Sequence, residues 1–192
     1  MHVQLLVRRL LIAFVLAVIA FASRAEYLSA QRKFRAIDRK QYRPGATVLI
    51  SAAELNAYVQ AELPQVAPTG IRAPHVELLG DNEATGSAKI DFLKLRSTRE
   101  GKQPNWIVRQ LLQGEHDVAI TTRISSGRGT ATVVLQRVEI AGVPITGGAL
   151  DFLVRNYLIP NYPDAKIGRP FALHSRVERI EVTPQAARVI VR

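Results

Sequence analysis

The stretch His116–Ile140, HDVAITTRISSGRGTATVVLQRVEI, predicts two long strands joined by a glycine-containing turn. The first strand alternates along its length, with Val118, Ile120 and Ile124 on one side. The returning strand, residues 130–140, has apolar side chains on both faces: Val133, Val134, Leu135, Val138 and Ile140. A strand that is apolar on both faces is either covered on both sides or lines something on one of them.

Further hairpins and helices surround this pair of strands. Strands are expected in two more pairs, each separated by turn residues: 71–79 with 84–95, and 171–182 with 187–192. A helix precedes each hairpin, and the three helices start near residues 52, 104 and 147. The sequence therefore predicts an α+β fold, in which a curved antiparallel sheet built from successive hairpins packs on apolar helices.

The helix that begins at Gly147 has the clearest apolar stripe. Its apolar residues recur at the spacing of one helix face: Leu150, Leu153, Val154, Tyr157 and Leu158. The first of the three helices follows Ser51 and Glu54, which have the spacing of a capping box, and it should stop at Pro64. The middle helix is expected at 104–113, with the proline at its first position.

The segment Leu10–Ala22, LLIAFVLAVIAFA, is wholly apolar and follows two arginines. Thirteen helical residues span only about 20 Å, against roughly 30 Å for the hydrocarbon core of a bilayer. Small-x-small triplets at 20–22 and 23–25 fit signal-peptidase sites. Residues 1–25 are therefore predicted to be an export signal, either cleaved or kept as a short single-pass membrane anchor. A buried core helix is the alternative.

The net charge of +10 is concentrated beside this apolar segment. Residues 1–43 carry nine Lys and Arg against two acids, whereas residues 44–192 carry seventeen against fourteen. A nucleic-acid reader would carry its basic patch on the folded domain, so no nucleic-acid partner is expected.

Residues 26–43 are helix-compatible, but their basic residues cover most of the helix circumference and leave no strong apolar stripe. We interpret this segment as a basic juxtamembrane stalk in contact with anionic lipid headgroups, or else as a solvated linker helix. The headgroup contacts would be Arg32, Lys33, Arg35, Arg39, Lys40 and Arg43.

The remaining residues, 44–192, are expected to form a single α+β domain. The small-x-small triplets favour an exported protein of the cell envelope. Lys and Arg are nearly balanced on the two sides of the apolar segment, so the positive-inside rule leaves open a cytoplasmic-facing domain on the same anchor.

The sequence has no catalytic or metal-binding pattern. It contains no cysteine, and its four histidines are too scattered for ligand spacing. It has no Gly-x-Ser-x-Gly elbow, and a strand, not a helix, follows the glycine-containing turn at 125–129. We therefore expect a non-catalytic protein with no metal and no cofactor.

Two segments resemble bacterial envelope proteins of the tubular lipid-binding (BPI-like) type: ISAAELNAYVQAELP at 50–64 and IGRPFALHSRVERIEVTPQAARVIV at 167–191. In that family a curved antiparallel sheet wraps a helix. The resemblance implies binding of a phospholipid or a lipid-linked precursor, without catalysis.

An apolar groove for an acyl chain would be lined by Val133, Val134, Leu135, Leu150, Leu153, Val154, Tyr157 and Leu158. Apolar periodicity does not separate such a groove from a closed core, because apolar pockets need few polar residues. The alternative is therefore an envelope scaffold or assembly protein, whose apolar faces form only a core and whose partners are other envelope proteins.

Overall fold

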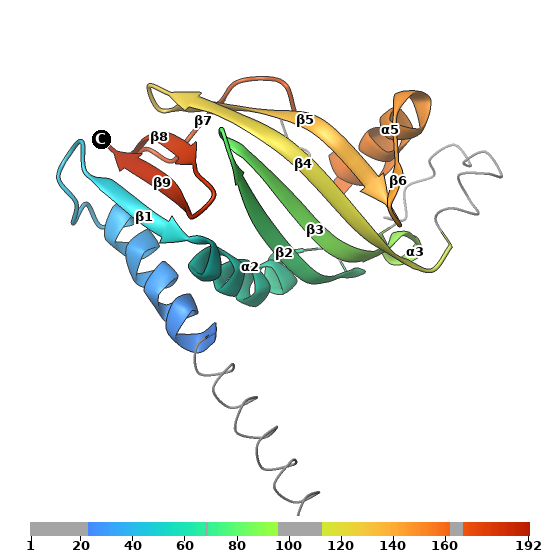
Figure 1. The fold of residues 1–192 in the computed structure, drawn as a ribbon, viewed down its shortest axis with the longest axis horizontal. Coiled ribbons are helices and arrows are strands. Elements are labelled where there is room, and N and C mark those ends of the chain that lie inside the picture. The colour runs from blue at the N-terminus through green and yellow to red at the C-terminus, as the bar shows by residue number, and fades with distance from the viewer. Residues whose placement is uncertain (1–22, 68, 96–112, 162–166) are drawn as a thin grey trace, which may run out of the picture.

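The computed structural model describes residues 23–67, 69–95, 113–161 and 167–192. The fold is α+β with antiparallel sheets, as predicted, but the strands form two sheets and not one. The long sheet contains, in order, β2 (Ile71–Gly80), β3 (Glu83–Asp91), β4 (Glu115–Gly127), β5 (Thr130–Ile140) and β6 (Val143–Pro144), and β7 (Phe171–Ala172) also pairs with β5. The short sheet has the order β1 (Thr47–Ser51), β9 (Ala186–Val191), β8 (Val177–Val182). Figure 1 shows the long sheet as a curved layer with the short sheet at one end.

The short sheet brings together strands from near the two ends of the described chain. Thr47 in β1 lies opposite Ile190 in β9, while β8 and β9 form the predicted hairpin at the end of the sequence. A pairing between segments so far apart leaves no local sequence signal, which is why one continuous sheet was expected.

Side chains and turns of the long sheet bind the outer edge of β8. The Ser126 hydroxyl accepts from the Ile180 amide at 2.8 Å and donates to the Ile180 carbonyl at 2.6 Å. The Asn82 side-chain oxygen accepts from the Val182 amide at 2.9 Å. These bonds satisfy backbone groups that an open sheet edge would leave unpaired, and they join the two sheets.

The N-terminal helix (residues 23–38) packs against the short sheet. Ala30 is fully buried and Ile37 is 5% exposed, and Ile37 shares a core cluster with Val48 and Ile50 of β1. The interpretation that this segment lacks an apolar stripe is therefore wrong. The helix is built into the core of the domain.

Helix α2 (Ala52–Val66) begins with the predicted capping box, since the Ser51 hydroxyl accepts from the Glu54 amide and the Glu54 carboxylate accepts from the Ser51 amide. It runs two residues past Pro64, where the sequence predicted its end. Asn56 uses its side-chain amide to pair both the N–H and the C=O of Val76 in β2. This helix thereby covers part of the open edge of the long sheet.

A second layer of helix lies against the long sheet near β5 and β6, seen at the right of Figure 1. It consists of α5 (Gly147–Leu153), a turn of π-helix η1 (Val154–Leu158) and α6 (Ile159–Asn161), joined without a break. The short helix α3 (Phe92–Leu95) follows β3 and contributes two buried residues to the same core cluster as Val118, Val138 and Ile140.

A β-bulge in β5 decides which of its side chains face this core. Thr121 lies opposite Arg137 but Thr122 lies opposite Leu135, so Gln136 is an extra, unopposed residue. An extra residue reverses the alternation of faces, which places Leu135 on the same face as Val138. The prediction that β5 is apolar on both faces is therefore wrong: Val134 alone of these residues points away, and it is 41% exposed.

Within the described residues, no helix is long and apolar enough to cross a membrane. The apolar segment Leu10–Ala22 and the helix expected at 104–113 lie outside the described residues.

Candidate apolar binding site

An apolar cavity of about 210 Å³ lies between the long sheet and the helix formed by α5 and η1. Its floor comes from β2, β3, α3, β4 and β5, and it includes Ile71, Phe92, Val118, Ile120 and Ile140. Its roof consists of Leu150, Leu153, Val154, Tyr157 and Leu158. Among the described residues, every side chain in the lining is apolar apart from the hydroxyl of Tyr157.

The roof is not packed tightly onto the floor. No residue of α5 or η1 is buried, whereas the floor residues Val118, Val138 and Ile140 are at most 7% exposed. Interiors of proteins are normally close-packed. A helix with an apolar stripe that stays half-exposed above a buried floor therefore encloses space that the described residues do not fill.

The π-helical turn lies in this roof. The Ile159 amide donates to the Val154 carbonyl, five residues earlier, where an α-helix would use the fourth. Single π-turns are rare in proteins, and those that occur are frequently found at functional sites. Here the turn includes three residues that face the cavity, namely Val154, Tyr157 and Leu158.

Aromatic contacts fix the position of Tyr157 over the floor. Its ring meets Phe92 edge-on, with the ring centroids 5.3 Å apart, and meets Phe152 at 6.2 Å. Phe92 is 5% exposed and belongs to α3. Edge-to-face pairs of this kind contribute roughly 0.5–1.5 kcal/mol, enough to hold one side of the roof in place while the rest stays loosely packed.

The structure brings together most of the residues that the sequence proposed for an acyl-chain groove. The members that line the cavity are Leu135, Leu150, Leu153, Val154, Tyr157 and Leu158. Val134 points to the opposite face. Val133 is not part of the cavity lining, and its backbone forms an isolated bridge with Ile167. Sequence reasoning missed the floor residues, although the alternation of Val118 and Ile120 in β4 was the signal that could have identified them.

The opposite face of the long sheet is polar. Ion pairs cross between neighbouring strands there, including Lys89 with Asp117 at 2.9 Å and Arg123 with Glu83 at 2.6 Å. Thr85 and Thr121 share a hydrogen bond of 2.9 Å on this face. The sheet thus has one apolar face toward the cavity and one charged face toward solvent, as antiparallel sheets commonly do.

Among the residues proposed to contact lipid headgroups, Lys33 has a structural role. Its ammonium donates to both carboxylate oxygens of Glu54 at 2.6 Å and to the Leu49 carbonyl at 2.7 Å. Burial alone would raise the pKa of Glu54, but hydrogen bonds from Lys33, Ser29 and the Ser51 amide outweigh it, so that pKa lies below its ordinary value. The other five residues of that set are exposed: Arg32, Arg35, Arg39, Lys40 and Arg43.

No family model, no curated protein and no solved structure matches this chain. The resemblance to tubular lipid-binding proteins therefore stays a prediction, and the function has to be argued from the geometry of the site.

Proposed function

We propose that this protein binds the acyl chain of a lipid in the cavity between the long sheet and the α5–η1 helix. The supporting observation is an apolar cavity whose roof stays half-exposed over a buried floor. A cell-envelope location, based on the apolar segment Leu10–Ala22, is part of the same proposal.

The lining selects for an apolar ligand. Burial of an unpaired polar group costs about 1–3 kcal/mol in proteins, and apart from the Tyr157 hydroxyl no lining side chain in the described part of the chain could pair with one. Sugars, nucleotides and peptides are disfavoured for this reason. A hydrocarbon chain gains roughly 0.8 kcal/mol for each buried CH₂ group.

The size of the cavity restricts the ligand further. Pockets for drug-sized molecules have about 300–1,000 Å³, whereas this one has about 210 Å³. It therefore accommodates part of one acyl chain, and a longer chain would have to lift the roof helix or extend from its open side. The rest of a phospholipid would stay outside the cavity.

A fluorescent fatty acid, parinaric acid, tests the proposal on the full chain. We expect saturable binding to the wild-type protein, and at least about tenfold weaker binding, equivalent to 1.4 kcal/mol, for Val154→Phe. The larger side chain would fill the cavity from the roof, where Val154 is half-exposed and its backbone is helical.

Val134→Phe is the matched control, because it makes the same change on the opposite face of β5. It should bind as the wild type does. A lack of saturable binding, or equal loss in both variants, would contradict the proposal. A lipid-free organic extract of the purified, folded wild-type protein would point instead to a closed core, and to an envelope scaffold with protein partners.

A further inference from the structure

The net positive charge of residues 23–192 is concentrated at one end of the fold. The N-terminal helix and the short sheet come from residues 23–51 and 167–192, which together hold twelve Lys and Arg against four Asp and Glu. Residues 52–166, which form α2 and most of the long sheet, hold twelve of each and are neutral in sum. The sequence showed the excess only at the N-terminus, because the C-terminal segment, residues 167–192 with five Arg against two Glu, is brought beside the N-terminal helix by the β1–β9 pairing.

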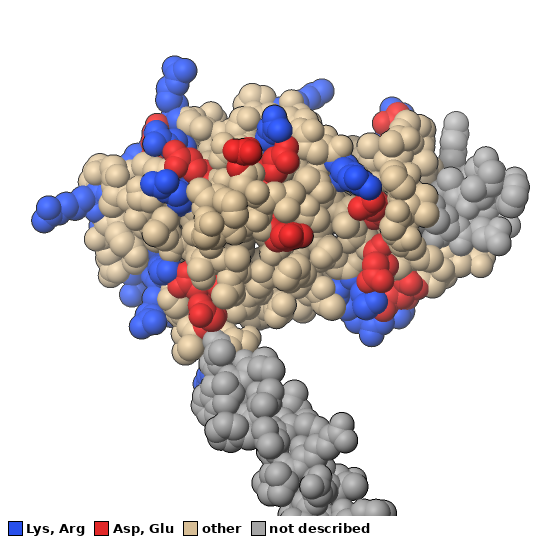
Figure 2. Space-filling view, in the orientation of Figure 1, with Lys and Arg blue, Asp and Glu red and all other residues tan. Residues whose placement is uncertain are grey.

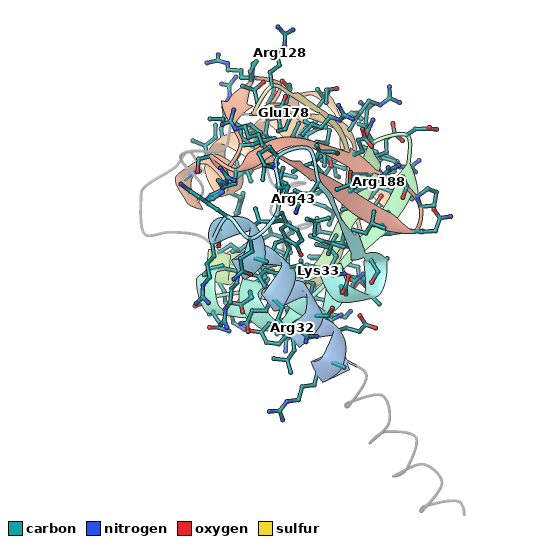
Figure 3. The ribbon with its side chains drawn as sticks, turned by 90° about the vertical axis from the view of Figure 1, so that its left-hand side faces the viewer. Arg32, Lys33, Arg43, Arg128, Glu178 and Arg188 are labelled. Atoms are coloured by element: carbon teal, nitrogen blue, oxygen red, sulfur yellow. The ribbon has the colours of Figure 1, made fainter. Side chains whose placement is uncertain are left out.

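The figures show the same division. In Figure 2, Lys and Arg side chains extend from the end that carries the short sheet, while acidic and basic atoms lie side by side elsewhere. Figure 3 looks onto that end, where Arg32, Arg43, Arg128 and Arg188 are spread from the N-terminal helix to the β4–β5 turn.

Most of the cations at this end have no ion pair within the described residues; the exceptions are Lys33, which pairs with Glu54, and Arg179 and Arg188, which share Glu181. Arg32, Arg35 and Arg39 line an open groove of about 490 Å³ along the N-terminal helix, and none of them has an ion pair with a described carboxylate. By contrast, four cations of the long sheet are ion-paired: Arg72, Lys89, Arg123 and Arg137. The free positive potential therefore belongs to the basic end, defined here as residues 23–51, residues 167–192 and the β4–β5 turn.

We infer that the basic end docks on the surface of a membrane that contains anionic lipid. In the sequence, the N-terminal helix follows directly on the apolar segment Leu10–Ala22, so a lipid surface is the anionic partner whose chemistry matches both features. Each Lys or Arg close to such a surface adds to the attraction. The surface combines the proposed stalk residues with cations that the sequence did not suggest, such as Arg128 and Arg188.

The inference requires a defined orientation. A 16-residue helix is about 24 Å long, while electrostatic attraction fades over about 8–10 Å in physiological salt. Arg39, at the far end of the N-terminal helix, would not feel the lipid if that helix stood upright. The helix and the short sheet must therefore lie along the surface.

The chain has no cysteine, so a single introduced cysteine can carry a fluorescent label. We would label Ser175→Cys at the basic end, or Leu93→Cys on α3 at the other end of the molecule, and both positions are exposed. The full-length protein is reconstituted into vesicles of phosphatidylcholine with or without phosphatidylglycerol. Energy transfer to a headgroup dye then reports how close each label lies to the bilayer.

In vesicles with phosphatidylglycerol, the Ser175 label should show the higher transfer. That excess should disappear without the anionic lipid, and in about 1 M salt, where the screening length falls to about 3 Å. Equal transfer from both labels under all conditions would overturn the inference, and it would leave the acyl-chain proposal untouched.

Two variants with the same net charge make the test specific. Replacing Arg32, Arg43, Arg128 and Arg188 with Gln removes four charges from the basic end, and should abolish the excess transfer. Replacing Arg72, Lys89, Arg123 and Arg137 with Gln removes four charges from the long sheet, and should retain it. Equal behaviour of the two variants would overturn the inference. Displacement of the protein from the vesicle surface by a random-sequence DNA duplex, added at a phosphate concentration equal to that of the lipid, would also overturn it.

Discussion

At the scale of single residues, Glu54 connects three elements. Its buried carboxylate accepts hydrogen bonds from Ser29 and Lys33 of the N-terminal helix and from the Ser51 amide at the start of α2. The Glu54 side chain is 6% exposed and the Lys33 side chain 30%. A carboxylate that is this buried and has this many donors holds the N-terminal helix to the domain, in addition to capping α2.

Glu54→Gln should lower the free energy of unfolding by about 1–3 kcal/mol, because the amide cannot pair with Lys33 and leaves donors unsatisfied. The pKa of Glu54 is lowered from 4.5 in the folded protein, so the stability it supplies is fully present above about pH 4.5 and is lost as the pH falls through the lowered value. The difference between wild type and variant in urea unfolding should therefore shrink toward acid pH. Glu77→Gln, at an exposed position of β2, should change little at any pH.

At the scale of elements, the positions of most strands were predictable, but the bulge in β5 and the buried stripe of the N-terminal helix were not. The period-two pattern located β2, β4, β5 and β9 closely, since alternation is a local property. The strand predicted at 84–95 ends at Asp91, because residues 92–95 form α3, and the strand predicted at 171–182 is divided into β7 and β8. The bulge at Gln136 is invisible to that method, because one inserted residue merely makes β5 look apolar on both faces. In the N-terminal helix, Ala30, Phe34 and Ile37 have helical spacing, but the surrounding basic residues obscured that stripe.

The same limit applies to the candidate site. The roof of the cavity was predictable, because Leu150, Leu153 and Tyr157 repeat along one helix face. The floor draws residues from separate strands, and their meeting depends on sheet register, which the sequence alone did not supply. Val134 was wrongly placed beside Leu135 for the same reason, since the bulge decides which of them faces the cavity.

Deletion of Gln136 tests the bulge at this scale. Without the extra residue, either Leu135 or Val138 must turn from the buried face to the charged face of the sheet. We expect loss of cooperative thermal unfolding, because burial of several apolar side chains is lost together. Gln136→Ala retains the residue count and should change stability by no more than about 0.5 kcal/mol. A deletion variant as stable as Gln136→Ala would show that the bulge does not set the faces of β5.

At the scale of the whole molecule, the two sheets have different properties. The long sheet carries the apolar cavity and lies in a part of the chain, residues 52–166, that is neutral in sum, while the segments that form the N-terminal helix, the short sheet and their adjoining loops carry the positive charge. In the proposals above, one sheet holds the acyl chain and the other holds the membrane surface. Such a division works only if the two sheets move as one body. The hydrogen bonds that join the long sheet to the edge of β8 must therefore hold.

A double variant, Asn82→Ala with Ser126→Ala, tests that connection. It removes the side-chain partners of the Val182 and Ile180 amides, and an unsatisfied buried amide costs about 1–3 kcal/mol. Hydrogen exchange at these two amides should accelerate by at least about tenfold, while amides of β3 and β4 stay protected. The two substitutions should be non-additive, because both act on the same strand.

Thr85→Val with Thr121→Val is the control for this experiment, since those hydroxyls pair within the long sheet and do not reach β8. It should leave exchange at Ile180 and Val182 unchanged. Unaltered exchange in the Asn82/Ser126 variant would mean that packing and the backbone bonds from Asn82 to Val182 and from Gly129 to Glu178, and not these side chains, join the sheets. In that case the orientation of the cavity above the membrane would not depend on the Asn82 and Ser126 side chains.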